Sequence, residues 1–344
     1  MENIFIEDMS PEELSTTMEA MGEKRFRGAQ IFEWLHRRLA VDYGEMTNLP
    51  GALRTRLAKE APLHNLRIED RQESADKSTR KYLYRLSDGH LVESVWMRYH
   101  HGNSVCISSQ VGCRMGCRFC ASTLDGLERN LRPYEMLAQI YGIIRDTGER
   151  VSNVVVMGMG EPLDNYDHLL RFLSLITCEK GQNISQRGIT VSTCGLVPAM
   201  KRLAEERLQI TLAVSLHGST EEKRRALMPV ANRYDLKALM EACRYYFDRT
   251  GRRITFEYAL AAGVNDGKEE IRELKSLLKG LNCHINLIPI NPVRERDFGP
   301  SCGQTVAEFK AGLEAAGLQV TVRRQMGGDI EGACGQLRRR HTEA

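Results

Sequence analysis

The feature that most constrains the fold is the alternation of short β-branched runs with longer amphipathic stretches after Gln110. Six runs are typical of buried strands, at residues 153–159, 188–194, 210–216, 253–260, 284–290 and 319–324. Stretches with apolar residues at helical spacing lie between them, at 134–146, 168–176, 236–247 and 269–278. Such alternation favours a parallel sheet with right-handed crossovers. We therefore predict an α/β fold, a doubly wound sheet or a full or partial barrel, with its chemistry at the carboxyl ends of the strands.

The first part of the chain follows other patterns. Ser10-Pro11-Glu12-Glu13 is a typical helix start with a capping box, and further apolar residues recur at helical spacing up to about residue 60. From Lys81 the period becomes that of strands, with turns at residues 87–90 and 101–103. We predict a small helical accessory domain at 1–75, a β-hairpin linker at 76–104, and the α/β domain with a C-terminal catalytic loop at 105–344.

Composition excludes several classes of protein. The 344 residues carry 48 Lys and Arg against 45 Asp and Glu, so a nucleic-acid partner requires the basic residues to gather on one face. No run approaches 18 apolar residues, and the acidic N-terminus is unlike a signal peptide, so we expect a cytoplasmic protein with no membrane contact. Ten cysteines in the cytoplasm are not expected to form a disulfide framework. A tight cysteine cluster is then metal-binding or catalytic.

Cys113, Cys117 and Cys120 form that cluster, on a loop just after a predicted strand. A structural zinc site normally needs four protein ligands in two pairs, and the sequence offers no second tight pair. Three thiolates can instead hold a [4Fe–4S] cluster and leave one iron open to chelate S-adenosylmethionine. An electron from such a cluster cleaves the sulfonium to a 5′-deoxyadenosyl radical, which no side chain can generate alone. An incomplete zinc site or incidental cysteines are the alternatives.

The spacing Cys-x3-Cys-x2-Cys, with Phe119 before the last cysteine, resembles the signature of the radical S-adenosylmethionine superfamily. That resemblance implies a partial (β/α)6 barrel. Six ordered motifs over almost the whole chain are similar to those of the bacterial adenine-2 methyltransferases of 23S rRNA and tRNA: SSQVGCRMGCRFCAS (108–122), GMGEPLDN (158–165), VSTCGL (191–196), SLHG (215–218), NLIPINP (286–292) and GGDIEGACGQL (327–337).

The resemblance also implies a mechanism with residues outside the cluster. Carbon 2 of adenine is too electron-poor to attack a sulfonium methyl, so a radical route is needed. Cys334 matches the cysteine that first accepts a methyl group, and Cys106 matches the one that later releases the product by forming a disulfide. Glu93 matches the acidic residue assigned as proton acceptor. Each methylation would consume two molecules of S-adenosylmethionine, at one cluster per chain.

Cofactor and partner assignments complete the prediction. Residues at strand ends that match family positions for S-adenosylmethionine are Gly160, Glu161, Ser192, Ser215, His217 and Asn291. The implied substrates are an adenosine of the peptidyl-transferase centre in 23S rRNA and the adenosine next to the anticodon of tRNA, with the N-terminal helices binding RNA. The base must be unstacked or flipped to reach the barrel mouth. We expect a monomer that takes electrons from a flavodoxin or ferredoxin.

Two other functions remain open on sequence grounds. A close relative methylates carbon 8 of the same rRNA adenosine and confers antibiotic resistance, and it uses the same cysteines. The complete GMGEPLDN and SLHG motifs favour carbon 2. The other alternative is a non-catalytic RNA-binding protein with a structural zinc, which would need a fourth zinc ligand.

Overall fold

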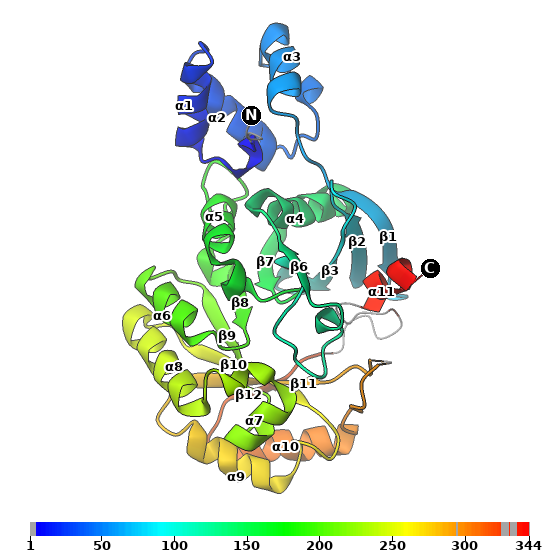
Figure 1. The fold of residues 1–344 in the computed structure, drawn as a ribbon, viewed down its shortest axis with the longest axis vertical. Coiled ribbons are helices and arrows are strands. Elements are labelled where there is room, and N and C mark those ends of the chain that lie inside the picture. Colours follow the sequence, from blue (N-terminus) through cyan, green and yellow to red (C-terminus); the bar gives the residue numbers. More distant parts are fainter. Residues whose placement is uncertain (1–4, 294, 325–329, 331–335, 344) are drawn as a thin grey trace.

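The computed structural model describes residues 5–293, 295–324, 330 and 336–343. Three N-terminal helices lie together at one end of the molecule (Figure 1): α1 (Pro11–Ala20), α2 (Phe26–His36) and α3 (Gly51–Glu60). The predicted capping box opens α1, where Glu13 N donates to Ser10 Oγ over 3.2 Å and Ser10 N donates to Glu13 Oε2 over 2.7 Å. These reciprocal bonds satisfy two backbone donors that a helix start leaves unpaired.

One ten-stranded sheet forms the centre of the molecule, in the order β1-β2-β3-β4-β7-β8-β9-β10-β11-β12. Its first strands run antiparallel, and from β4 onward the strands are parallel. Their bounds are β1 (Arg67–Glu73), β2 (Thr79–Arg85), β3 (Leu91–Tyr99), β4 (Gly102–Cys106), β7 (Val151–Val156), β8 (Ile189–Thr193), β9 (Thr211–Ser215), β10 (Ile254–Leu260), β11 (Cys283–Pro289) and β12 (Val320–Val322). A separate two-stranded sheet pairs β5 (Gln110–Gly112) with β6 (Leu127–Asn130).

Helices connect the parallel strands, so the chain from β4 to α10 forms six strand–helix units. The connecting helices are α4 (Pro133–Thr147), α5 (Tyr166–Ile176), α6 (Val197–Glu205), α7 (Glu221–Leu227), α8 (Leu236–Thr250), α9 (Lys268–Leu277) and α10 (Gly303–Ala315). Both α7 and α8 belong to the unit that begins with β9. Because β1 and β12 are the two edges of the sheet, the barrel stays open. The predicted partial (β/α)6 barrel is confirmed. The strands β2 to β4, which include the predicted hairpin linker, belong to the same sheet as the barrel strands. The division of the chain into three domains stays a prediction.

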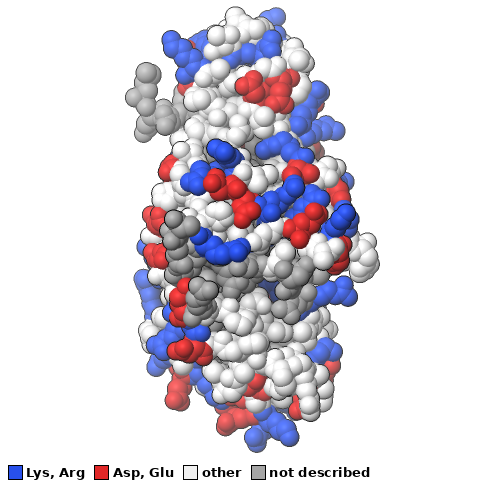
Figure 2. All heavy atoms as spheres, turned by 90° about the vertical axis from the view of Figure 1, so that its right-hand side faces the viewer, with Lys and Arg blue, Asp and Glu red and all other residues white. Residues whose placement is uncertain are grey.

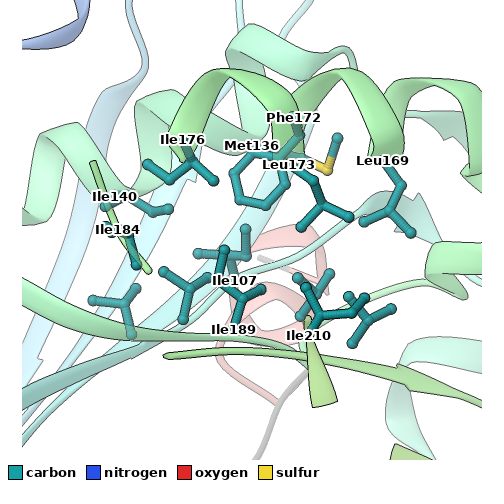
Figure 3. Close-up of a cluster of buried hydrophobic side chains, with 14 of the residues drawn as sticks. Ile107, Met136, Ile140, Leu169, Phe172, Leu173, Ile176, Ile184, Ile189 and Ile210 are labelled. Carbon is teal, nitrogen blue, oxygen red and sulfur yellow. The ribbon is translucent and has the colours of Figure 1, made fainter. Parts of the chain in front are cut away.

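The core between the sheet and its covering helices explains the helical pattern of the sequence. Figure 3 shows Phe172 and Leu173 of α5 and Met136 of α4 directed toward the same interior as Ile189 of β8. All four side chains are buried. This apolar packing holds the helices against the strands and so fixes the strand ends that carry the site.

The C-terminal helix α11 (Gln336–Glu343) lies beside the antiparallel strands, at the right of Figure 1, whereas α6 and α8 lie at the left. Leu337 is fully buried there against Leu83 and Leu91. Among the described helices, none combines the length and apolar character that a membrane crossing requires.

Candidate active site

The three clustered cysteines lie on a loop between β5 and a 3₁₀ turn at Ala121–Thr123. Backbone bonds shape this loop: Cys113 N donates to Gly126 O over 2.7 Å, and Cys120 N donates to Cys117 O over 3.1 Å. The hydroxyl of Thr123 donates to the carbonyls of both Cys117 and Cys120, over 3.0 Å each. The loop conformation is therefore held by backbone and hydroxyl donors.

Glycine is required where the loop begins. Gly112 has φ +75°, and a Cβ at this position would lie 2.0 Å from Gly126 O. No side chain fits at that distance, and L-residues rarely adopt this backbone conformation. The glycine in Gly112-Cys113 thus allows the strand β5 to turn into the ligand loop.

Nine of the predicted site residues line one cavity of about 310 Å³. They are Cys113, Cys117, Cys120, Gly160, Glu161, Ser192, Ser215, His217 and Asn291. The cavity lies at the carboxyl ends of β7 to β11, as expected for a parallel α/β fold. It places the thiols, the buried carboxylates of Glu161 and Glu257, and several neutral polar groups around a space large enough for a nucleoside-sized ligand.

Glu161 is held at the edge of this cavity by a turn that follows β7. Its Oε2 accepts from Cys194 N over 2.7 Å and its Oε1 accepts from Leu163 N over 3.0 Å. The preceding Gly160 has φ +102°, and a Cβ there would lie 2.5 Å from the side chain of Gln110. Burial raises the pKa of Glu161, although the Cys194 backbone bond opposes this. A cationic ligand would be stabilised beside this carboxylate.

Gln110 joins the cysteine loop to the glutamate turn. Its Oε1 accepts from Glu161 N over 2.8 Å, and its Nε2 donates to Asp164 Oδ2 over 3.0 Å. Asp164 also forms an ion pair with Arg114 of the cysteine loop. These bonds fix the thiols and the carboxylate relative to each other.

His217 stands in the cavity as a neutral hydrogen-bond donor. Its Nδ1 accepts from Ala259 N over 2.9 Å, so the ring proton is on Nε2. Burial lowers the pKa of His217 to about 3. The ring packs edge-on against Phe119, with centroids 4.9 Å apart. Its φ of +54° is unusual for a residue other than glycine.

Of the other predicted site residues in the described part of the chain, Glu93 and Cys106 do not line the cavity. Glu93 is fully buried, with Oε2 3.1 Å from Lys81 Nζ and Oε1 accepting from Arg338 N over 2.6 Å. Cys106 is buried among Val95, Met97 and Val155, next to cavity-lining Met157. Cys334 lies outside the described residues. The roles assigned to these three residues stay predictions.

Comparison with known proteins identifies the family. The chain is 57% identical over 338 residues, 98% of its length, to a probable dual-specificity RNA methyltransferase RlmN from Lachnospira eligens, of which 97% is covered. A protein of the same name from Alkaliphilus oremlandii is 51% identical over the full length of both chains. The chain belongs to the RlmN family.

Other comparisons agree with membership of the RlmN family. Residues 107–277 match the radical SAM superfamily, and residues 4–63 match the ribosomal RNA large subunit methyltransferase N-terminal domain. A crystal structure of a radical SAM methyltransferase from Sphaerobacter thermophilus superposes with a TM-score of 0.93 at 45% identity, covering 97% of this chain and 98% of the other. The predicted fold class and the assignment to the radical SAM methyltransferases are confirmed.

RlmN membership in the radical SAM superfamily implies a [4Fe–4S] cluster and S-adenosylmethionine. The three thiols fit the cluster, since they line one cavity with Glu161. Burial raises the pKa of Cys113 to about 12, so these thiols need a cationic centre to become thiolates. Among the described residues, no three side chains are placed to ligate a single metal ion. Three thiolates are the donor set that would hold a [4Fe–4S] cluster and leave one iron open, whereas a structural zinc site normally takes four protein ligands.

Sequence reasoning missed two buried charged residues near the RlmN-family site. Glu257 lines the cavity from β10. The fully buried Arg224 of α7 donates a hydrogen bond to the carbonyl oxygen of Cys194, a cavity-lining residue, over 2.7 Å. Glu257 could have been found from the sequence, because it is a charged residue within the apolar strand pattern of residues 253–260. A buried charge in such a position needs a partner or a ligand.

Proposed function

We propose that this chain methylates carbon 2 of an adenosine in 23S rRNA, at the peptidyl-transferase centre, and of the adenosine next to the anticodon in tRNA. The observation that carries the proposal is the single cavity that unites the three thiols with Glu161 and His217 in a chain matched over its full length by the RlmN relatives. Those relatives are named as dual-specificity RNA methyltransferases.

The cavity residues divide the work of holding the reactants. Cys113, Cys117 and Cys120 hold the cluster, and Glu161 accepts hydrogen bonds from the ammonium group of S-adenosylmethionine. When bound, the cluster and S-adenosylmethionine supply the one-electron chemistry that an electron-poor aromatic carbon requires. The Nε2–H of His217 donates to the ligand, while Ser192, Ser215 and Asn291 add polar contacts at the strand ends, so these groups set the orientation of the ligand.

A second group of residues acts on the methyl group and the base. The Cys334 thiolate takes the methyl, which gives up a hydrogen atom to the one-electron chemistry that the bound cofactors supply, so that its carbon can join the adenine. The carboxylate of Glu93 then accepts the proton that the adenine ring loses. The Cys106 thiolate then attacks the tethered sulfur, which releases the product and leaves a disulfide that two electrons reduce. Arg338 N, bonded to Glu93, comes four residues after Cys334, which keeps the carboxylate within a short length of chain of the methyl carrier.

We also propose the stoichiometry of the cofactors, the reductant and the part of the chain that binds RNA. The enzyme is a cytoplasmic monomer with one cluster per chain, consumes two molecules of S-adenosylmethionine per methylation, takes electrons from a flavodoxin or ferredoxin, and uses residues 1–75 to help bind RNA. Figure 2 shows basic and acidic side chains interspersed on the face that carries α11. Ion pairs such as Arg129 with Asp88 over 2.6 Å neutralise part of the basic charge of the chain. The basic side chains do not form one uninterrupted patch on this face, and RNA binding is expected to weaken as salt rises, because phosphate contacts release counterions.

Mass spectrometry of rRNA and tRNA nucleosides tests the function. RNA from cells that lack the gene should contain no 2-methyladenosine, and the intact gene should restore it in both RNA classes. Appearance of 8-methyladenosine would contradict the proposed position, and restoration in rRNA alone would contradict dual specificity. Restoration of neither would overturn the proposed function.

Metal analysis of the anaerobically purified protein tests the cofactor assignment separately. The proposal requires about four irons with matching sulfide per chain, in line with one cluster. One zinc per chain without sulfide would identify the site as structural instead.

A further inference from the structure

A row of polar side chains crosses four neighbouring strands beneath the cavity. Glu257 on β10 is in register with Ser215 on β9 and with Asn286 on β11, and Asn286 is in register with Thr321 on β12. Residues in register on parallel strands project to the same face of the sheet. Glu257 therefore lies at the same level as Ser215, and both line the cavity.

A hydrogen-bond chain runs along this row and ends at Glu257. Asn286 Nδ2 donates to Glu257 Oε2 over 2.9 Å, which turns Asn286 Oδ1 toward Thr321. Thr321 Oγ1 donates to that oxygen over 3.2 Å, and it lies 3.1 Å from His284 Nε2. Since the threonine proton is already used, His284 Nε2 must be the donor in the last bond. The direction of every bond is thus fixed from His284 to the carboxylate.

The carboxylate of Glu257 is buried, and few of its lone pairs accept a hydrogen bond from described residues. Glu257 is 3% exposed, and within the described part of the chain only Asn286 donates a hydrogen bond to it. Burial raises its pKa, while the positive charge of Arg323 at the cavity edge favours the ionised form. A buried carboxylate without a full set of donors is unfavourable, so its remaining lone pairs need donors from a ligand.

We propose that Glu257 is a further binding residue of this cavity, whose carboxylate accepts hydrogen bonds from the ribose hydroxyls of S-adenosylmethionine. This inference rests on the proposed function, in that it takes S-adenosylmethionine as the ligand. Asn286, Thr321 and His284 are positioning residues, since they orient the carboxylate without reaching the ligand.

The chemistry of the carboxylate selects the ribose. A carboxylate only accepts hydrogen bonds, and a vicinal diol offers two donors at the spacing of its two oxygens. The adenine edge fits less well, because its amine lies next to ring nitrogens whose lone pairs a carboxylate repels. The ammonium group is excluded because it is already assigned to Glu161. A nucleotide inside an RNA chain has one free hydroxyl and flanking phosphates. The free ribose of S-adenosylmethionine therefore fits better than the ribose of the substrate.

Calorimetric binding of S-adenosylmethionine to the anaerobic, cluster-loaded enzyme tests this. Because Asn286 donates to residue 257, the carbonyl of Glu257→Gln must take that bond and its amine must face the ligand. Affinity should fall about 10- to 100-fold, as expected for lost hydrogen bonds to a charged group. Glu241→Gln, at an exposed site on α8, is the matched control and should leave affinity unchanged.

A 2′,3′-dideoxyribose analogue of S-adenosylmethionine separates direct contact from an indirect effect. Wild-type enzyme should bind it weakly, and Glu257→Gln should bind it as well as wild type within about twofold. An equal loss for both ligands, or no loss for either, would overturn the inference. So would a loss of RNA affinity without a loss of S-adenosylmethionine affinity, because that would assign the carboxylate to the substrate ribose.

Two further measurements keep the test decisive. Iron content and thermal unfolding show whether Glu257→Gln is intact, and if it is not, Thr321→Val replaces it. Thr321→Val removes the hydrogen bond to Asn286, so the hydrogen-bond chain is interrupted two residues before Glu257. The variant should weaken S-adenosylmethionine binding several-fold and leave binding of the dideoxy analogue unchanged. Equal binding of S-adenosylmethionine to Thr321→Val and wild type would count against the inference. Since no RNA is needed for the calorimetry, failure of the proposed RNA specificity would not affect these results.

Discussion

At the scale of single residues, buried charges identify the working parts of this molecule. Glu161 shows how such a group is prepared: two backbone donors hold its oxygens, and burial keeps water away from it. The carboxylate retains further lone pairs for a ligand ammonium. A fixed, partly satisfied carboxylate loses little freedom on binding, which favours affinity.

We predict that Glu161→Gln weakens binding of S-adenosylmethionine by about 10- to 100-fold, because a charge-assisted bond to the ammonium is lost. Iron content should remain that of wild type, since Glu161 is not a cluster ligand. Equilibrium dialysis with labelled S-adenosylmethionine measures the first quantity and colorimetric iron analysis the second. Unchanged affinity would remove Glu161 from the site.

Lys81 and Glu93 form a buried ion pair, with both side chains fully excluded from solvent. Removing only the lysine leaves a buried negative charge, so Lys81→Met should lower the free energy of unfolding by about 3–5 kcal/mol. Lys81→Met with Glu93→Leu should recover most of that loss, because neither charge is then buried. Urea unfolding of the two variants checks this, and a double variant no more stable than Lys81→Met would contradict it.

At the scale of elements, the sequence pattern predicted what periodicity and capping determine. The helix expected at 236–247 is α8, and the strand expected at 253–260 is β10. The helices α6, α7, α10 and α11 and the strands β1, β5 and β6 were missed. The strand β1 has the polar sequence Arg67–Glu73, and its place at the sheet edge depends on pairing with β2, not on an apolar alternation.

The same limit applies to the candidate site. Strand ends predicted that Ser192, Ser215 and His217 would lie together, because parallel strands present their carboxyl ends at one edge. The partner of Glu93 was not predictable, since Lys81 faces it only through the register of β2 and β3. Docking of α11 was equally hidden, because it depends on contacts far apart in the sequence.

The docking of α11 makes a prediction at this scale. Leu337 is fully buried between Leu83 and Leu91, so Leu337→Ala should weaken the docking by about 2–5 kcal/mol. Amide hydrogen exchange in residues 336–343 should become faster while exchange in β7 to β11 is unchanged. His341→Ala, which removes only a half-buried pair with Asp70, is the control and should have an effect below about 1 kcal/mol. Exchange in 336–343 that matches wild type in Leu337→Ala would contradict this docking.

At the scale of the whole molecule, the proposed reaction joins distant parts of the chain. Cys106 ends a strand near the middle of the sheet, and Cys334 precedes α11 near the C-terminus. If Cys334 carries the methyl group, Cys334→Ala should form no RNA adduct. Cys106→Ala should still add to adenine but fail to release it, so it should purify with RNA attached covalently. Denaturing gels with nuclease treatment detect the adduct, and the reverse pattern would show that the two roles are exchanged.

His36 lies where the N-terminal helices meet the barrel. Its Nδ1 is 2.9 Å from Tyr141 Oη of α4, and Gln182 Nε2 donates to its carbonyl over 2.9 Å. Burial lowers the pKa of His36 to about 3, so the folded protein keeps the ring neutral where the unfolded chain, with a pKa near 6.5, takes up a proton. The unfolded state then binds more protons, and stability falls as the pH falls from about 6.5 toward 3.

The loss attributable to His36 is about 2 kcal/mol between pH 7 and pH 5, from the pKa difference in that window. His36→Phe removes the titrating group, so its free energy of unfolding should fall by about 2 kcal/mol less than that of wild type over the same range. Urea unfolding at pH 5, 6 and 7 measures both slopes. The variant will also lose the bond to Tyr141, which lowers stability equally at every pH and leaves the slope as the informative quantity. Parallel pH dependences for the two proteins would mean that the junction between the N-terminal helices and the barrel does not depend on a neutral His36.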